Sequence, residues 1–535
     1  MYDYVIVGAG SSGCVLANRL SQDGRCRVLL LEAGPKDTNP WLKIPAGLSR
    51  VFVHPTLNWG YSTDPEPHLG NRRIYWPRGK TLGGSSAING MAYVRGHPGD
   101  YDEWRQLGNA GWSWENVLPY FKRSERNARG ASEYHGGDGE LSVTDPTLRH
   151  PASQAFVQSA VSAGISAVDD FNDGRQEGVS FLQFTIKNGV RNSTASAFLT
   201  PARNRDNLTI EVGAQVQRIL FEGKRATGLI YRVGQEKRQV QAREIILSAG
   251  VINSPQLLML SGVGPAEHLR EHGIDVVHNL EGVGENLHDH IYVHYRCRVD
   301  AAFSINQYLH GWRVLPHALQ YALRQKGILT LGASQACAFV RSGAHIDRPD
   351  LQINFRPMST VFTPEGKILS DPFPGVTASV SHLRPQSRGR VRLKSANPLV
   401  PPSMLANYLA IDEDRNALLA GLHWIRRIFS SKPMADHIQE ETAPGRNIRS
   451  DDEILNFIRD NAQSMYHPVG TCRMGHDELA VVDDRLRVRG LQGLRVIDAS
   501  IMPVIVSGNT NAPSIMIAEK GAAMILEDMS KSGIV

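Results

Sequence analysis

The chain has 535 residues, of which 41% are hydrophobic and 21% charged, and its formal net charge is +5. The chain is longer than a single hydrophobic core usually organises, which predicts about two or three domains, or one large domain with insertions. Lys and Arg are scattered without a dense basic run, which argues against a nucleic-acid partner.

The N-terminal residues YDYVIVGAGSSGCVLANRLSQDGRCRVLLLEAG (2–34) predict a strand, a turn, a helix and a second strand. Residues 4–7 are apolar and β-branched, as in a buried parallel strand. Residues 8–13 form a G-x-G-x-x-G turn, and apolar residues then recur at helical spacing over 15–20. A second apolar strand over 28–31 ends at Glu32.

The positions of these glycines predict a dinucleotide site. Gly8 permits a tight turn, Gly10 lets the backbone approach a pyrophosphate, and Gly13 lets the helix pack on the strand. The helix N-terminus supplies N–H donors to the phosphates, and Glu32 can accept hydrogen bonds from ribose hydroxyls. The pattern itself does not choose between NAD and FAD.

A second glycine-rich block, WPRGKTLGGSSAINGMAYVRG, covers residues 76–96. It has glycine turns, small hydroxyl side chains and few bulky residues before Met91. Such backbone suits close contact with a planar ring or a diphosphate. An ordinary surface loop is the alternative. It is disfavoured because surface loops rarely contain so many small apolar residues.

A third block, EIILSAGVINSPQLLMLSGVG, covers residues 244–264. Residues 245–247 predict a strand and 248–250 a turn. We expect a helix to begin at Ser254-Pro255, with proline at the first helical position, and Gly262 to end it. The pattern alone does not distinguish a cofactor-binding segment from a strand-turn-helix unit with a purely structural role.

The long segment 296–459 lacks such glycine patterns. Leu351–Phe355, Val376–Ser381 and Val391–Leu393 predict strands of a sheet roofing the site. Tyr308–Arg324 and Asp412–Ile428 have helical spacing, and we expect both helices to pack into the core. Together with the loop 41–61, this roof supplies aromatic candidates for the substrate pocket: Trp41, Phe52, Trp59, Tyr61, Phe303, Phe355 and Phe362.

Near the C-terminus the chain reads YHPVGTCRMG (466–475) and later SGNTNAP (507–513). A lone histidine such as His467 is more often structural than catalytic. Its interpretation therefore depends on whether the remaining blocks build a redox cofactor site beneath it.

The cysteines are odd in number and lack a C-x-x-C pair, which argues against a zinc ribbon and a disulfide framework. Cys472 and His476 alone do not make a metal site, so no metal is expected. A first strand at Tyr4 leaves no room for a cleavable signal peptide, and no apolar stretch reaches the length of a bilayer span. We expect a cytoplasmic protein, with a peripheral contact on the inner face of the membrane left open.

The four blocks, in this order and at these spacings, resemble the signature motifs of the glucose–methanol–choline (GMC) oxidoreductases, over nearly the whole chain. The resemblance is closest to the choline-dehydrogenase-like and alkanol-dehydrogenase-like branch. It implies an α/β architecture: a Rossmann-like FAD-binding domain with an antiparallel-sheet substrate domain. The expected division assigns 1–160, 200–295 and 460–535 to the FAD domain, and 161–199 and 296–459 to the substrate domain.

The resemblance also implies which residues contact FAD. The pyrophosphate falls to the first glycine turn, the adenosine ribose to Glu32, the adenine to Val216, and the flavin to the stretch from Leu82 to Ala92. The implied cofactor-binding residues are Gly8, Gly10, Ser11, Ser12, Gly13, Glu32, Ala33, Leu82, Gly84, Asn89, Gly90, Met91, Ala92, Val216, Tyr466, Asp498, Ala499, Asn509 and Thr510. Some relatives attach FAD through a histidine where this chain has Ile88, so non-covalent FAD is expected.

For catalysis the resemblance places His467 and Asn511, 44 residues apart, over the flavin N5 atom. His467 would be the general base in oxidation of a primary alcohol to an aldehyde by hydride transfer to N5, and Asn511 would be the hydrogen-bond partner that holds the substrate oxygen as a donor. The expected electron acceptor is a quinone or another respiratory acceptor. No cage for a quaternary amine can be assigned from the sequence, so an uncharged alcohol is preferred to choline.

Several alternatives stay open. An alcohol oxidase would pass the electrons to oxygen and form hydrogen peroxide. A lyase or decarboxylase could use the same scaffold without net redox turnover. An NAD-linked dehydrogenase is disfavoured because flavin-type blocks already match the nucleotide pattern, and a binding protein would not need His467 and Asn511 together. The oligomeric state is open.

Overall fold

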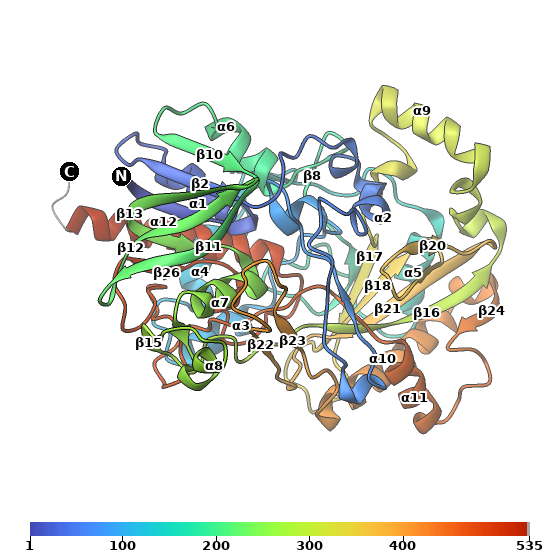
Figure 1. Ribbon diagram of the computed structural model, residues 1–535. Helices are drawn as coiled ribbons and strands as arrows, with labels where there is room; N and C mark the ends of the chain where they lie inside the picture. Colours follow the sequence, from blue (N-terminus) through green and yellow to red (C-terminus); the bar gives the residue numbers. More distant parts are fainter. Residues whose placement is uncertain (532–535) are drawn as a thin grey trace.

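Two seven-stranded sheets organise the chain in a computed structural model that describes residues 1–531 (Figure 1). The first sheet has the strand order β10-β2-β1-β13-β12-β11, with β26 beside β13. Its strands are β1 (Tyr2–Val7), β2 (Val28–Glu32), β10 (Leu208–Val212), β11 (Ala214–Glu222), β12 (Arg225–Val233), β13 (Glu236–Leu247) and β26 (Leu494–Val496).

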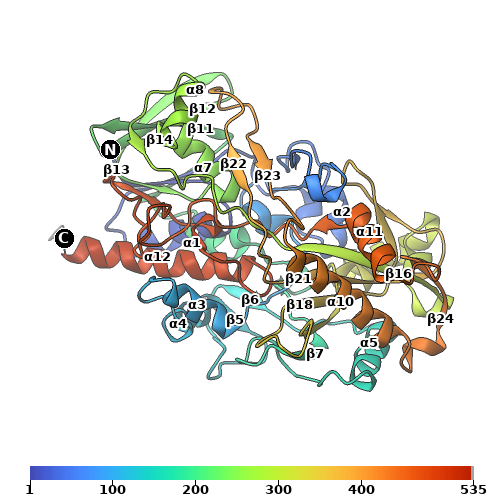
Figure 2. The same cartoon turned by 90° about the horizontal axis from the view of Figure 1, so that it is seen from below.

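The part of this sheet formed by β10, β2, β1, β13 and β26 is parallel, and β2, β26 and the C-terminal ends of β1 and β13 are buried on both faces. Such strands read as continuous apolar runs, which is why residues 4–7 show no alternation. The helices α1 (Ser11–Leu20) and α12 (Asn511–Lys531) pack against each other, and α4 (Trp114–Ser124) packs on α12 (Figure 2).

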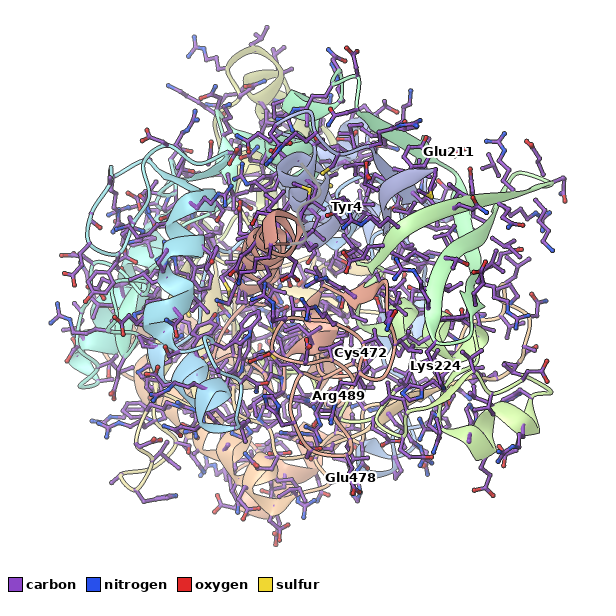
Figure 3. The ribbon with its side chains drawn as sticks, turned by 90° about the vertical axis from the view of Figure 1, so that its left-hand side faces the viewer. Tyr4, Glu211, Lys224, Cys472, Glu478 and Arg489 are labelled. Atoms are coloured by element: carbon purple, nitrogen blue, oxygen red, sulfur yellow. The ribbon has the colours of Figure 1, made fainter. Side chains whose placement is uncertain are left out.

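The other half of β13 continues with β12 and β11 as an antiparallel extension. Figure 3 views the molecule from this side, with Tyr4 inside and Lys224 in the turn that joins β11 to β12. Glu211 on β10 ties this extension to the parallel part, because its carboxylate accepts a hydrogen bond from the Tyr231 hydroxyl at 2.9 Å.

The second sheet is antiparallel, with the order β24-β16-β21-β18-β17-β7 and β25 beside β16. Its strands are β7 (Gly178–Phe181), β16 (Ile291–Val299), β17 (Ala336–Val340), β18 (Leu351–Arg356), β21 (Gly375–His382), β24 (Ile438–Ala443) and β25 (Gln463–Ser464). The helices α5 (Pro151–Ser162) and α10 (Asp412–Phe429) pack on one face, and α11 (Asp451–Asn461) packs on α10. Side chains alternate between the two faces of a strand, so the other face is free to line a cavity.

Shorter elements connect these layers. The remaining helices are α2 (Leu48–Val51), α3 (Pro98–Gln106), α6 (Thr200–Ala202), α7 (Gly250–Leu260), α8 (Ala266–Glu271) and α9 (Leu315–Arg324). The short strands are β3 (Tyr61–Ser62), β4 (Tyr75–Trp76), β5 (Glu125–Asn127), β6 (Leu141–Val143), β8 (Ile186–Lys187), β9 (Val190–Arg191), β14 (Val263–Gly264), β15 (His278–Asn279), β19 (Thr360–Phe362), β20 (Ile368–Ser370), β22 (Arg390–Arg392) and β23 (Ser403–Leu405). Within residues 1–531, none of the helices is long and apolar enough to cross a bilayer.

The mixed α/β architecture, the first strand-turn-helix-strand unit and helix α10 agree with the sequence prediction. Helix α7 does not, because it begins at Gly250 and holds Pro255 in its interior. Proline there cannot donate to the Val251 carbonyl four residues earlier. The Thr471 hydroxyl satisfies that carbonyl instead, at 2.6 Å, so a distant loop stabilises a helix that the local sequence would have started later.

One further expectation, about the strands of the roof, is wrong in part. Strands β18 and β21 belong to the sheet above the cavity, but β22 pairs only with β23 in a separate hairpin. Helix α5 packs with the second sheet, although the expected boundary at residue 160 divides it between domains. That domain division stays a prediction.

The expected helix over 308–324 is also shorter and differently placed. Two single turns, Asn306–Tyr308 and Gly311–Val314, precede α9, and Pro316 lies in its first turn. The expected core packing is wrong for this helix, because its leucines face solvent. By contrast, Leu418, Leu422 and Ile425 of α10 are buried as expected.

Candidate functional site

A cavity of about 1220 Å³ runs between the two sheets. One wall consists of the turns after β1, β2 and β13 and the start of α12. The opposite wall carries Tyr292 and His294 of β16, Asn354 and Arg356 of β18 and Ser379 of β21. Ligands of α/β proteins bind at the carboxyl ends of parallel strands, where this cavity begins.

The first glycine turn has the geometry of a phosphate cradle. Gly8 has φ +95°, and a Cβ there would lie 2.6 Å from the Ser248 carbonyl oxygen. A Cβ on Gly13 would lie 1.9 Å from the Gly8 oxygen, so this glycine lets α1 approach β1. A Cβ on Gly10 would meet nothing closer than 4.0 Å, which leaves its backbone open to the cavity. These are the separate roles that a dinucleotide-binding turn requires.

Glu32 is buried at the end of β2 and lines the cavity. Its two carboxylate oxygens accept hydrogen bonds from the backbone N–H groups of Ala9 (3.0 Å) and Gly34 (2.8 Å). Burial raises the pKa of Glu32 to about 7. Each oxygen keeps a second lone pair, so the side chain can still accept from ribose hydroxyls.

The second glycine block lies directly on the cradle. The Gly83 N–H donates to the Ala9 carbonyl at 2.7 Å, and a Cβ on Gly84 would lie 2.7 Å from the Gly10 Cα atom. Arg191, buried behind this block, donates to both the carbonyl (2.7 Å) and the side-chain oxygen (2.8 Å) of Asn89. The two glycine turns, about 75 residues apart in sequence, thereby form one wall of the cavity. Glycine allows this close backbone contact, and larger residues would prevent it.

Asp498, after β26, anchors the third block. Its side chain accepts from the Gly250 N–H (2.8 Å), the Ser254 hydroxyl (2.6 Å) and the Ser500 N–H (2.8 Å). The carboxylate thus fixes the N-terminal end of α7 at the cavity wall.

The structure brings nearly all of the expected cofactor residues to this one cavity. Those that line it are Gly8, Gly10, Ser11, Ser12, Glu32, Ala33, Gly84, Asn89, Gly90, Met91, Ala92, Val216, Tyr466, Asp498, Ala499, Asn509 and Thr510. Gly13 and Leu82 do not line it: Gly13 is the contact between α1 and β1, and Leu82 is buried in the core of the first sheet.

His467 lies in the loop between β25 and β26, with its ring between two polar neighbours. Its Nδ1 atom is 3.0 Å from Nδ1 of His290, and its Nε2 atom is 3.1 Å from Nδ2 of Asn509. Burial, with smaller effects from His290 and Arg78, holds the pKa of His467 well below its ordinary value. The imidazole is therefore neutral near pH 7 and can accept a proton.

The hydrogen bonds of His290 determine the tautomer of His467. Nε2 of His290 lies 2.9 Å from the Leu383 carbonyl oxygen, which can only accept, so this nitrogen carries the hydrogen. Burial lowers the pKa of His290 to about 3, so its ring is neutral and its Nδ1 is an acceptor. Nδ1 of His467 must then be the donor, and the lone pair of His467 is on Nε2.

The side chain that contacts Nε2 of His467 is that of Asn509, whereas the sequence analysis expected Asn511 to act beside this histidine. The Asn509 amide nitrogen donates to the Nε2 lone pair of His467. Asn511 is the first residue of α12, and its side-chain oxygen accepts from the Ser11 hydroxyl at 2.8 Å. At the start of the helix Asn511 faces the phosphate cradle, while Asn509, two residues before the helix, faces the histidine.

Asp289 holds the loop that carries His467, a role that the sequence analysis missed. Its carboxylate accepts from the His467 N–H (2.7 Å), the Ser464 hydroxyl (2.5 Å) and the Tyr408 hydroxyl. Burial raises the pKa of Asp289 to about 6. The signal was present in the run NLHDH (286–290), where two histidines flank an aspartate directly before a strand.

The loop also has an unusual backbone. Tyr466 has φ +64°, its ring packs edge-on against Phe52 at 5.4 Å, and its carbonyl accepts from the Arg78 guanidinium at 2.5 Å. A non-glycine residue in this conformation is strained and persists only when its surroundings hold it. Arg78 and Asp289 provide that support from either side of His467.

The wall formed by the second sheet is aromatic and basic. Arg356 lies 3.0 Å from His294 Nε2, and His294 stacks on Phe362 at 5.7 Å. Among the described residues, the cavity has no carboxylates other than Glu32 and Asp498, which belong to the nucleotide side. A cationic group would therefore find no counter-charge on this wall.

Only some of the expected aromatic residues reach the cavity. Trp41, Phe52, Trp59 and Phe362 line it. Tyr61, Phe303 and Phe355 belong instead to the core between the second sheet and its helices. Alternation along β18 explains the last case, because Asn354 and Arg356 face the cavity while Phe355 stacks on Phe156 of α5 at 4.7 Å.

Two family models match the chain, and together they cover most of it. Both are described as GMC oxidoreductase, one matching residues 2–292 and the other residues 385–518. The first contains the glycine blocks, and the second contains His467 and Asn509.

Curated relatives align over almost the full length. An "Alcohol dehydrogenase [acceptor]" from Pseudomonas putida is 46% identical over 542 residues, covering 100% of this chain and 97% of the relative. An "Oxygen-dependent choline dehydrogenase" from Brucella ovis is 42% identical, covering 98% of this chain and 95% of the relative.

Solved structures share the fold. Pyridoxine 4-oxidase from Mesorbium loti superposes with a TM-score of 0.90 at 30% identity, covering 98% of this chain and 99% of the other. Formate oxidase from Aspergillus oryzae RIB40, described in a study of FAD modification, gives a TM-score of 0.92 at 28% identity and covers 99% of both chains.

Proposed function

This chain belongs to the GMC oxidoreductase family, as its motif blocks predict, and from that premise we propose that it oxidises an uncharged primary alcohol to an aldehyde. GMC oxidoreductases bind FAD, and the cavity fits that group: an open glycine turn, an acid at the end of β2 and a long volume that reaches His467. When bound, FAD supplies at its N5 atom the acceptor for the hydride that leaves the alcohol carbon.

One observation carries the proposal: the hydrogen bonds of His290 leave a lone pair on Nε2 of a neutral His467 beside the cavity. A general base for an alcohol needs this lone pair near neutral pH. We propose that His467 Nε2 takes the hydroxyl proton as the C=O bond forms. Asn509 Nδ2, which contacts Nε2 in the absence of substrate, would then donate to the substrate oxygen.

The remaining polar groups position this pair. Asp289 fixes the backbone of the His467 loop, and Arg78 holds the strained Tyr466 carbonyl. Positioning of this kind matters because small displacements of a catalytic base are costly in rate. Asn511 and Ser11 would act at the pyrophosphate rather than at the alcohol.

The substrate class follows from the charge of the second wall. Arg356 faces the cavity, and the described residues place no carboxylate near it. A quaternary amine would require an aromatic cage with a compensating negative charge. We therefore propose a neutral alcohol, although one close relative is named for choline.

For the electron acceptor we propose a quinone or another respiratory acceptor. The support is the 46% identical relative, whose name specifies an acceptor. Oxygen is the competing acceptor, since other relatives are named oxygen-dependent or oxidases. The test compares steady-state turnover of one short primary alcohol in air-saturated buffer and, without oxygen, with a soluble quinone analogue. Faster turnover with the quinone supports the proposal, whereas equally fast turnover with stoichiometric hydrogen peroxide would make the protein an oxidase.

A further inference from the structure

Helix α9 presents an apolar stripe to solvent. Leu315, Leu319 and Leu323 are 63%, 60% and 74% exposed. Residues four apart lie on one side of an α-helix, so these leucines form a single row. Trp312, in the turn just before the helix, is 74% exposed and extends the row. We call Trp312, Leu315, Leu319 and Leu323 the α9 face.

The opposite side of the helix is fixed to the protein. Tyr321 is buried, and its hydroxyl donates to the Gly189 carbonyl at 3.1 Å. His317 packs edge-on against Tyr308 at 5.1 Å. The leucines are therefore held outward by an anchored helix, which projects from the body of the molecule in Figure 1. Isolated exposed leucines are ordinary, but a contiguous row of this kind marks an interaction surface.

The α9 face lies among the segments that surround the cavity opening. Trp41 and Leu369 both line the cavity and are exposed to solvent, so they stand at its mouth. The turn after α9 (Ile328–Thr330) packs on the turn Pro45–Gly47, and residues of both turns line the cavity. Large apolar side chains are thus exposed on the segments around the opening: Trp41, Tyr308, Trp312, Leu315, Leu319, Leu323, Val361 and Leu369.

The charges on the segment that carries this face are of one sign. Residues 301–346 contain neither Asp nor Glu. They do contain Arg313 and Arg324, exposed at the two ends of the row, and Lys326 just after the helix. Leucine and tryptophan on one face with arginine and lysine beside them is the composition of helices that lie in the surface of an anionic bilayer.

We propose that the α9 face docks on an anionic phospholipid bilayer, with the helix lying in the interface and the cavity mouth close to the lipid. A second copy of the chain fits this face less well. A two-fold contact would place arginines of one copy near those of the other. One short helix row is also small beside the roughly 800 Å² per partner that stable interfaces bury. This inference does not depend on the proposed reaction.

Vesicle flotation of the FAD-loaded protein tests the proposal. The vesicles are phosphatidylcholine alone, or phosphatidylcholine with an equal amount of phosphatidylglycerol. We expect the protein to float with the mixed vesicles at low salt, and the double variant Leu319→Ser/Leu323→Ser to lower the partition coefficient at least about tenfold. The matched control Leu399→Ser/Leu479→Ser replaces two leucines that are about half exposed elsewhere, and it should float like the original protein.

Charge and oligomeric state complete the test. Arg313→Gln/Arg324→Gln should abolish the preference for phosphatidylglycerol, as should high salt. Turnover of a water-soluble alcohol should be unchanged in the leucine variants, which shows that they fold. The proposal is overturned if the original protein stays with the unbound fraction, if both leucine pairs have equal effects, or if the protein is a dimer that only Leu319→Ser/Leu323→Ser dissociates while no vesicle binding occurs.

Discussion

The Nδ1 atoms of His290 and His467 lie 3.0 Å apart, and the Leu383 carbonyl lies 2.9 Å from the other nitrogen of His290. A backbone oxygen thereby sets the tautomer of one buried histidine, which sets that of the next. The result is a lone pair on Nε2 of His467, where the proposed reaction needs a base.

The burial of His467 should be visible in the pH dependence of the reaction. His467 is the base only when it is neutral, and its lowered pKa keeps it neutral as the pH falls. We expect kcat/KM to hold below pH 6.5 and to decline only at a more acidic midpoint, which a pH profile measures. His290→Leu should lower kcat with FAD still bound, and His290→Gln should restore part of it because its side-chain oxygen can accept from Nδ1. An unchanged kcat in both variants would remove His290 from the positioning of His467.

The two asparagines of the Asn-Thr-Asn run should separate in their effects. Asn509→Ala removes the donor beside His467, and we expect kcat to fall about 10²-fold with normal FAD content. Asn511→Ala removes the contact with the Ser11 hydroxyl, and we expect FAD to bind about 2- to 10-fold more weakly while the loaded enzyme turns over almost normally. Flavin content and turnover are measured on the same preparations, and the reverse pattern would restore Asn511 as the catalytic partner.

FAD should be dissociable. Ile88 has no nucleophilic atom, and it stands where some family members carry the linking histidine. Precipitation with acid should leave all of the flavin in the supernatant, as absorbance shows. Yellow colour that stays in the washed pellet would contradict a non-covalent site.

Arg356 should discriminate against cationic alcohols. Choline and 3,3-dimethyl-1-butanol have nearly the same shape and differ in charge, so they form a matched pair. We expect kcat/KM for choline to be at least about 10²-fold lower, because the partly buried Arg356 at the cavity wall repels its cationic group without a carboxylate nearby. Arg356→Met should reduce the difference in kcat/KM between the two alcohols. Preference for choline by the original protein would contradict the neutral-substrate proposal.

Much of the nucleotide wall could be predicted because its constraints are local. Gly8 and Gly13 are required by backbone contacts within a few residues, and Gly10 by the open approach to the cavity. Each of these requirements can be recognised within one short stretch of sequence. The identity of the cofactor came from the agreement of several such stretches rather than from any single one.

The catalytic pairing could not be obtained in this way. An interval of residues between His467 and an asparagine does not say which side chain faces the histidine. That depends on where α12 begins, and it begins at Asn511. The role of Asp289 likewise depends on hydrogen bonds from three separate segments.

Helix α9 shows a related limit. The helical spacing of its apolar residues is visible in the sequence. Such spacing does not tell whether the apolar side of the helix faces the protein core or solvent. Tyr321, a single buried residue, fixes the orientation that exposes the leucines.

The central claim is that the cavity oxidises an alcohol with His467 as the base, and anaerobic mixing tests it most directly. The oxidised flavin band of the purified protein is followed after addition of a short primary alcohol, and the aldehyde is quantified. We predict bleaching with one aldehyde formed per FAD, and a rate about 10²- to 10⁴-fold lower in His467→Ala with FAD still bound. A band that does not bleach with any primary alcohol, as for a lyase, or an equally fast reaction in His467→Ala, would contradict the account.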